Sequence, residues 1–197
     1  MPIPADPHGT IVCIAGELLH IRTKGELGKY IALAIREYGM YDLQLISGKI
    51  ERDLRAVPFS YRKNVMPFMR EWIFGRYHTV LLMYRTGRFE SLFDPITNPE
   101  IYRSFCQMLP TGCLVTGDEY DPFPPVQAAW YHCFMYLMAA FAMYVLDEPG
   151  HPVGMPFPGG ESVRKSGNQY YCPIRDREEE IFYSICNFCP ALQDPNR

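Results

Sequence analysis

Three of the chain's seven cysteines, Cys172, Cys186 and Cys189, lie close together in the sequence, and the last two form a C-x-x-C pair. We call these three residues the tail cysteines. Thiolates hold zinc in a tetrahedron with Zn–S distances of about 2.3 Å, and a C-x-x-C pair lets two thiolates bind one ion. The spacing therefore predicts three ligands of a zinc site. Because proline follows both Cys172 and Cys189, as it follows some ferredoxin ligands, an iron–sulfur cluster is the alternative.

A structural zinc site or a four-iron cluster normally has four protein ligands, so a fourth residue must come from elsewhere in the chain. Cys113 is the first candidate, because it lies among glycines in an expected loop, where a side chain can be aimed freely. His151 is the second candidate, since it lies just upstream of the tail cysteines. Cys13, Cys106 and Cys133 are expected to be packed thiols, which are common as small core residues.

Two interpretations without a metal stay open for the tail cysteines. A C-x-x-C pair can be a redox dithiol, but the usual redox motif opens a helix, whose N-terminus lowers the thiol pKa. This pair instead follows an expected helix. The three thiols can also be inert core residues. We prefer the metal interpretation, with zinc as the expected ion.

His151 is also the best candidate for acid–base chemistry, because Asp147 and Glu148 lie close to it in the sequence. A histidine near its ordinary pKa beside carboxylates could accept a proton or bind a metal. A histidine hydrogen-bonded to the loop backbone is the simpler alternative. The chain has no phosphate-binding loop, dinucleotide fingerprint, H-E-x-x-H or G-x-S-x-G motif. No motif names a reaction, so whether the chain is an enzyme stays open.

The composition is that of an ordinary globular protein, with 48% hydrophobic and 21% charged residues in 197 residues. A net charge of -3 provides no broad basic surface, so a nucleic-acid partner is not expected. The cysteine count is odd, and the first residues lack the pattern of a secretory signal. We therefore expect a reducing, cytoplasmic location, where clustered cysteines favour metal binding over disulfides.

Apolar residues recur at three- and four-residue intervals through much of the chain, as in amphipathic helices. Pro58 is expected to end one helix, Pro67 to begin the next, and Gly87 to cap it. The expected helices are 27–38, 43–57, 67–85, 98–109 and 126–146.

The stretch 126–146 is apolar on every side and, at about 30 Å, long enough to cross a bilayer core. It also contains Gln127 and His132, and no Lys or Arg lies close to either end to set an orientation. We expect no membrane span here but a central helix that neighbouring helices cover on every face. Gln127 and His132 are then expected to form hydrogen bonds inside the core or to face a pocket.

The fold expected is mainly α, a helical bundle around the central apolar helix, with a small C-terminal β-hairpin plus helix that carries the tail cysteines. The chain reads as a single domain, residues 1–197. The hairpin is expected to turn at 166–168, and Asp176 to begin the following helix. The three parts are a helical core at about 14–147, a Pro/Gly loop at 147–160 and a cysteine module at 161–197.

The sequences HPVGMPFPGG at 151–160, YYCP at 170–173 and CNFCPA at 186–191 resemble an uncharacterised archaeal family. That family is found chiefly in methanogens and is catalogued as domain of unknown function 2115. The resemblance covers most of the chain and includes FGR at 74–76. The family has no established activity, so the resemblance implies no catalytic residue. It implies a strongly reducing cytoplasm rich in iron–sulfur proteins, which strengthens the cluster alternative.

Two classes of function follow from these observations. The first is a helical binding or accessory protein whose cysteine module is held by a metal and whose partner is an unknown protein or small molecule. The second is an enzyme in which the metal, or His151, acts on a small molecule at the Pro/Gly loop. Four protein ligands would favour the first class and an open coordination position the second. We prefer the first, because the sequence offers no nucleophile, and the oligomeric state is left open.

Overall fold

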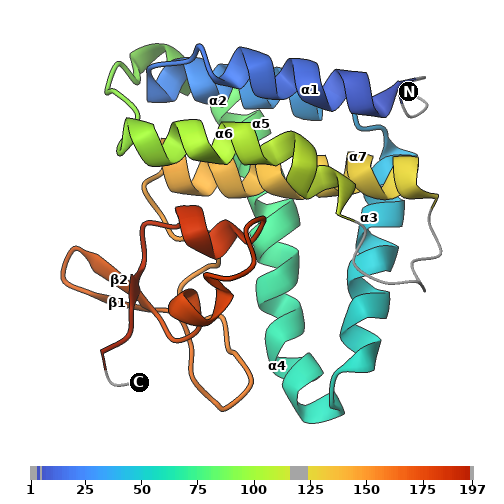
Figure 1. Cartoon of the computed structure of the whole chain (residues 1–197), viewed down its shortest axis with the longest axis vertical. Coiled ribbons are helices and arrows are strands. Elements are labelled where there is room, and N and C mark those ends of the chain that lie inside the picture. Colours follow the sequence, from blue (N-terminus) through green and yellow to red (C-terminus); the bar gives the residue numbers. More distant parts are fainter. Residues whose placement is uncertain (1–3, 5, 116–123, 196–197) are drawn as a thin grey trace.

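The computed structural model describes residue 4, residues 6–115 and residues 124–195. Helices make up most of the described chain, and a small sheet of three strands lies near the C-terminus (Figure 1). This confirms the mainly α fold with a central apolar helix and a C-terminal hairpin. The loop segment 116–123 lies outside the described residues.

Two helices at the start of the chain are fixed by hydrogen bonds at their first turns. Helix α1 (Pro7–Leu18) begins after Asp6, whose carboxylate accepts the Gly9 N–H at 2.9 Å. Helix α2 (Lys24–Ile35) begins with a capping box, in which Thr23 and Glu26 each accept the other's backbone N–H. The sequence analysis missed α1 and this capping box, and it placed the start of α2 three residues late.

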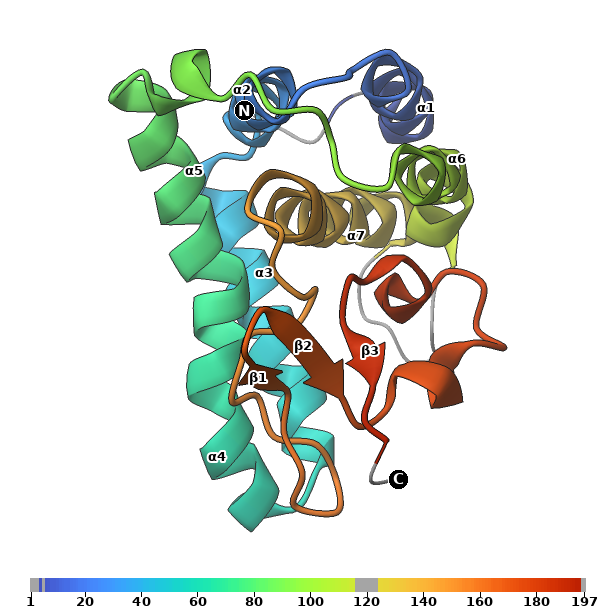
Figure 2. The ribbon, with the colours of Figure 1, turned by 90° about the vertical axis from the view of Figure 1, so that its left-hand side faces the viewer.

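Helix α3 (Met40–Asp53) continues into the short 3₁₀ turn η1 (Leu54–Ala56). Helix α4 (Phe59–Arg70), the π-helical turn η2 (Glu71–Gly75) and α5 (Arg76–Arg85) then form one long rod (Figure 2). The expectation that Pro67 begins this helix is wrong. Pro67 lies inside α4, which buries only Val65 and so lacks the apolar spacing that reveals a helix. Gly87 has a φ of 69°, which confirms its role as a helix stop.

Helix α7 (Pro125–Ala140) and the π-helical turn η4 (Phe141–Val145) form the central helix. Helices α1, α2 and α6 (Pro99–Leu114) pack against α7, and Figure 2 shows α7 end-on between these helices and the C-terminal part. By length and composition Gln127–Val145 could cross a membrane, but 83% of its most apolar window is buried inside the protein. This is the arrangement of a core helix.

Hydrogen bonds from buried tyrosines join the layers of the bundle. The Tyr38 hydroxyl donates to the Trp130 carbonyl at 2.8 Å, and the two rings stack with centroids 4.4 Å apart. The Tyr102 hydroxyl on α6 donates to the Leu18 carbonyl at the end of α1, also at 2.8 Å. Because both hydroxyls are buried and paired, these bonds fix the relative position of the helices without leaving a polar group unsatisfied.

The hairpin pairs β1 (Arg164–Ser166) with β2 (Gln169–Cys172), and the two-residue turn between them contains Gly167 at a φ of 58°. A third strand, β3 (Leu192–Gln193), pairs parallel to β2. The Arg164 guanidinium donates two hydrogen bonds to Asp194, at 2.6 and 2.8 Å, which fixes β3 against the hairpin. The hairpin is therefore confirmed, and the third strand was not foreseen.

The helix expected to begin at Asp176 is wrong. In its place the chain forms two 3₁₀ turns, η5 (Arg175–Glu178) and η6 (Ile185–Phe188), joined by turns. The Ser184 side chain accepts the Cys186 N–H at 3.3 Å, a local bond that competes with continuous helix. The cysteine module is consequently a set of short turns packed on a small sheet, with few regular backbone hydrogen bonds.

Candidate functional site

The three tail cysteines come together from different elements. Cys172 ends β2, Cys186 lies in η6 and Cys189 follows η6. All three line one small cavity of about 10 Å³, and His151 lines the same cavity. A space of this size holds about one water molecule or one ion. The four residues that the sequence analysis singled out near the C-terminus are thus neighbours in space.

Backbone N–H groups converge on two of the three sulfurs. The Gly150 N–H donates to the Cys189 Sγ at 3.3 Å, and the Ala191 N–H also donates to this sulfur. The Cys172 sulfur accepts N–H groups from Ile174 and Arg175, just beyond Pro173. Such bonds favour the thiolate form, because a negatively charged sulfur accepts them more strongly than a neutral thiol.

Burial acts on the tail cysteines in the opposite direction. It raises the pKa of the Cys186 thiol to about 12, and it also raises the pKa values of Cys172 and Cys189. The nearby Arg175 cation lowers the pKa of both Cys172 and Cys189. Since burial is the larger effect, the thiols are protonated near neutral pH when nothing else binds them, and a bound metal would displace these protons.

Arg76 is a buried cation beside the cluster. Only 7% of the residue is exposed, and no carboxylate of the described chain lies within ion-pair distance. Its guanidinium donates to the carbonyls of Gly150 at 2.6 Å and Pro149 at 3.0 Å. Burial lowers the pKa of Arg76 to about 10, so it stays charged. Arg76 therefore holds the loop segment that bonds Cys189, and it supplies positive charge that lowers the Cys189 pKa.

His151 is enclosed by aromatic rings. Its ring centroid lies 5.2 Å from that of Trp72 and 5.6 Å from that of Phe157. Burial, assisted by the Arg76 cation, lowers the pKa of His151 to about 4. The imidazole is then neutral near pH 7, as a metal ligand must be. A pKa this far below neutral makes it a weak general base, because efficient bases have pKa values near the working pH.

Asp147, which the sequence analysis expected to lie beside His151, forms its contacts with other residues. Asp147 pairs with Lys24 and accepts the Thr97 hydroxyl at 2.9 Å, and its φ is 54°, which is unusual for a residue other than glycine. These contacts fix the start of the Pro/Gly loop to α2 and to the segment before α6. Among the residues that the structure describes, Asp147 thus anchors the loop and makes no hydrogen bond or ion pair with His151.

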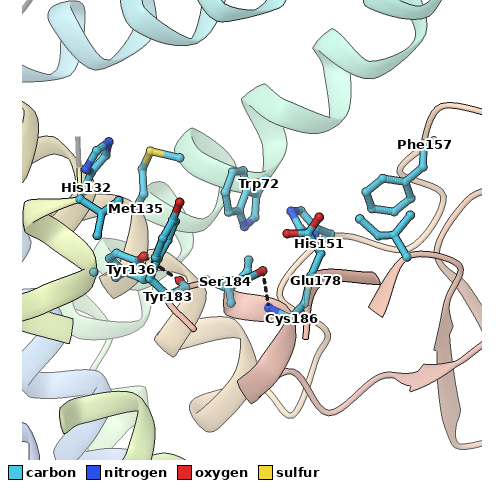
Figure 3. Close-up of a pocket in the computed structure, with 14 residues that line it drawn as sticks. Trp72, His132, Met135, Tyr136, His151, Phe157, Glu178, Tyr183, Ser184 and Cys186 are labelled. Carbon is cyan, nitrogen blue, oxygen red and sulfur yellow. Dashed lines mark hydrogen bonds between the residues drawn. The ribbon is translucent and has the colours of Figure 1, made fainter. Parts of the chain in front are cut away.

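The placement of Cys113 in a loop is wrong. Cys113 lies in the last turn of α6 and is buried in the bundle, where it meets Cys133. It does not line the cavity of the tail cysteines, so the structure brings His151 rather than Cys113 to them. Cys106 and Cys133 are buried as expected, whereas Cys13 is exposed on α1. His132 donates from Nδ1 to the Cys113 carbonyl oxygen, 3.3 Å away, and faces a larger cavity that His151 and Cys186 also line (Figure 3).

Within residues 6–115 and 124–195, no group of three or more His, Cys, Asp and Glu side chains is arranged so that it could hold a metal ion. The tail cysteines share a cavity, but their side chains do not surround a common point. Sequence reasoning missed Arg76 and Trp72. Arg76 stands out in the sequence as a charge within the apolar stretch WIFGRY and as part of the FGR sequence noted above, but nothing local to it indicated a contact with residues 149–150.

Comparison with known proteins identifies relatives in methanogenic archaea. The family model described as "Uncharacterized protein conserved in archaea (DUF2115)" matches residues 23–194. The UPF0305 protein MK0666 of Methanopyrus kandleri is 34% identical over 138 residues, which cover 70% of this chain and 87% of that protein. The UPF0305 protein MJ0646 of Methanocaldococcus jannaschii is 22% identical over 164 residues, covering 83% of this chain and 92% of that protein. No solved structure matches. The chain therefore belongs to the DUF2115 family of uncharacterised archaeal proteins.

Proposed function

We propose that this protein binds one metal ion through Cys172, Cys186, Cys189 and His151, and that the ion fixes the cysteine module to the helical bundle. Zinc is the expected ion, because three thiolates and one imidazole are a common structural zinc set. Four protein ligands leave no open position for a substrate. The proposal is therefore of a structural metal in a binding or accessory protein. An iron–sulfur cluster is the alternative occupant, and the same experiment distinguishes it.

The observation that carries the proposal is the charge balance around the cavity. Arg76 is a buried guanidinium whose hydrogen bonds go to backbone carbonyls, and the carboxylates of Glu148 and Glu71 attract it without forming an ion pair in the described chain. A buried charge without a close partner is costly. Three thiolates and one zinc ion carry a net charge of about -1. Bound beside Arg76, they would add negative charge to that of Glu148 and Glu71 and stabilise the buried guanidinium further. The N–H groups directed at the sulfurs of Cys172 and Cys189 support the same assignment, since such bonds accompany metal-bound thiolates.

Metal binding would require the ligand side chains to turn from their present positions. The ligands stand at the end of β2, in or beside the turn η6 and in the Pro/Gly loop, so binding would require rotation about their side-chain bonds to redirect the sulfurs. The backbone that carries them is already held by Arg76 and by the parallel pairing of β2 with β3. Binding would release protons from the thiols, so affinity should increase with pH.

The test is elemental analysis with an absorption spectrum on protein purified without oxygen. We expect one zinc ion per chain and no visible absorption band. If the protein instead contains iron and sulfide and shows a broad visible absorption band, the occupant of the site is an iron–sulfur cluster. Cys186→Ser and Cys189→Ser should each lose the metal and unfold at lower denaturant concentration. Cys13→Ser is the matched control, because Cys13 is exposed on α1 and should keep full metal content. Full metal content in both tail variants, or a metal-free protein, would overturn the proposal.

A further inference from the structure

An open groove runs along the rod formed by α4, η2 and α5, which lies at the edge of the molecule in Figure 2. Two hollows, of about 700 and 600 Å³, make up the groove, and they share Phe74 and His78. The first hollow is lined by the rod alone, and the second lies between the rod and α3. We call the surface from Phe59 to Arg85 the rod groove. It spans about 40 Å, at 1.5 Å per helical residue.

Large apolar side chains are exposed at both ends of the rod groove. Phe59 at the start of α4 is 71% exposed, Leu82 near the end of α5 is 62% exposed, and Met40 at the start of α3 is 73% exposed. Between these ends, Met66 and Phe74 continue the apolar lining. A single exposed hydrophobic residue is ordinary on a protein surface. A continuous apolar groove of this length instead indicates an interaction surface.

The α4 end of the rod groove is basic. Arg62 and Lys63 line it, and they form no ion pair with the residues that the structure describes. Arg70 lines it as well and pairs with Glu51 on α3, while Glu71 adds a carboxylate to the lining. Positive charge is thus in surplus here, although the net charge of the whole chain is -3. A partner with carboxylates beside an apolar stripe would complement this end.

The shape of the rod groove favours a helix as the occupant. The lining residues of the rod recur mostly at three- and four-residue intervals, so they form one stripe along its length. A partner helix laid along such a stripe can insert apolar side chains at i, i+3, i+4 and i+7, which is a common mode of peptide recognition. The π-helical turn η2 lies where the two hollows meet, and such turns occur frequently at functional sites. A flat membrane surface fits a hollow less well than a rounded helix does.

We infer that the rod groove docks an amphipathic helix of a partner protein, whose apolar stripe is flanked by Asp or Glu. The apolar side chains of that helix pack against Phe74 and Leu82, and its carboxylates meet Arg62 and Lys63. This inference goes beyond the proposed metal and does not depend on it. The groove residues include no proposed ligand, and they do not line the cavity of the tail cysteines.

The test uses the full chain and a fluorescently labelled helical peptide of about 18 residues, with one stripe of leucines, glutamates beside the stripe and alanines elsewhere. Fluorescence anisotropy should show saturable binding of one peptide per chain, with a Kd on the order of 10 μM. The same peptide with every glutamate replaced by lysine should bind at least about tenfold more weakly, because Arg62 and Lys63 repel it. Added salt should weaken the glutamate peptide, since it screens exposed charges.

Charge reversal at the basic end tests the assigned cations. Arg62→Glu combined with Lys63→Glu should weaken the glutamate peptide at least about tenfold and strengthen the lysine peptide. The matched control is Arg88→Glu combined with Arg103→Glu, which changes the net charge equally at two exposed residues that do not line the rod groove. Binding by this control should stay within about twofold of the original protein, because distant exposed charges are screened.

Removal of an exposed apolar side chain tests the stripe. Leu82→Ala should weaken the glutamate peptide about fivefold or more while the melting temperature stays unchanged, because Leu82 contacts solvent in the free protein. Phe93→Ala is the control, since Phe93 is 80% exposed and does not line the rod groove. It should leave peptide binding unchanged.

Several outcomes would overturn the inference. It fails if neither peptide binds, if both peptides bind equally well, or if the control variants weaken binding as much as the groove variants do. Binding of phosphatidylserine vesicles in place of the peptide would assign the rod groove to a membrane surface. A dimer in sedimentation that Leu82→Ala dissociates would assign it to a second copy of the chain, and either assignment would replace the partner helix.

Discussion

At the scale of single residues, Arg76 connects the helical bundle to the cysteine module. Within the described chain, its guanidinium donates hydrogen bonds to the carbonyls of both Pro149 and Gly150. Replacing Arg76 by alanine leaves both carbonyls buried and unpaired. We expect Arg76→Ala to lower the free energy of unfolding by about 2–4 kcal/mol, measured by urea denaturation.

The matched control for this change is Arg85→Ala, at the exposed end of the same rod. The Arg85 side chain is exposed and makes no ion pair or hydrogen bond with the described residues, so its removal should change the free energy of unfolding by less than about 0.5 kcal/mol. Equal losses of stability in the two variants would mean that Arg76 contributes no more than any arginine on this rod. Its hydrogen bonds to Pro149 and Gly150 would then not stabilise the contact between the bundle and the cysteine module.

Only some residues of the candidate site could be predicted from the sequence, and Arg76 is one that could not. Spacing alone predicted that Cys172, Cys186 and Cys189 act together, because C-x-x-C is a local pattern, and the shared cavity agrees with it. The preference for Cys113 over His151 rested on an expected loop, and the chain forms helix there. Arg76 and Trp72 could not be assigned, since their contacts join positions more than seventy residues apart.

At the scale of elements, the approach of α2 to the 3₁₀ turn η3 (Arg88–Ser91) depends on glycine. A Cβ at Gly25 would lie 2.2 Å from the Phe89 carbonyl oxygen and 2.6 Å from that of Leu92. Both are backbone atoms that cannot turn aside, so Gly25→Ala must push the elements apart. We expect a loss of about 2–3 kcal/mol in the free energy of unfolding.

Gly48 provides the opposite case on another helix. It lies within α3, and a Cβ there would meet nothing within 4 Å. Gly48→Ala should therefore stabilise the protein by about 0.5–1 kcal/mol, because alanine loses less backbone freedom than glycine in a helix. Thermal unfolding of both variants checks the pair. If they shift the melting temperature in the same direction, helix propensity rather than close packing controls these positions.

Most of the helices could be predicted because their apolar residues recur at helical intervals, as in α2, α3 and the central helix. The arm formed by α3 and α4 buries little, so the first half of α4 carried no such signal. The turns η5 and η6 replaced an expected helix where local side-chain bonds compete with the helical pattern. Their position is determined by contacts with the bundle, such as the Tyr136 hydroxyl bond to the Tyr183 carbonyl, which no local pattern encodes.

At the scale of the whole molecule, the bundle and the cysteine module are stabilised differently. The bundle buries long apolar helices, while the module relies on short turns, a small sheet and the metal that we propose. Removing the metal with a chelator should therefore speed hydrogen exchange in residues 149–194 and leave the amides of α1, α6 and α7 protected. Mass spectrometry of the exchanged protein, with and without chelator, measures this difference.

The Cys186→Ser variant should give the same regional pattern without chelator, which separates loss of the site from other effects of the chelator. An unchanged pattern in both experiments would argue that packing alone holds the module. A uniform increase across all helices would show that bundle and module unfold as one unit.

The central position of α7 also affects how the protein is made. Helices α1, α2 and α6 all pack against a helix that follows them in the sequence. During synthesis, the faces of these earlier helices that contact α7 stay uncovered until α7 emerges. At ordinary translation rates, α1 waits on the order of 10 s for residues 125–145 to appear. We therefore expect pauses in translation before Pro125 to prolong the exposure of these faces and to increase aggregation of the nascent chain.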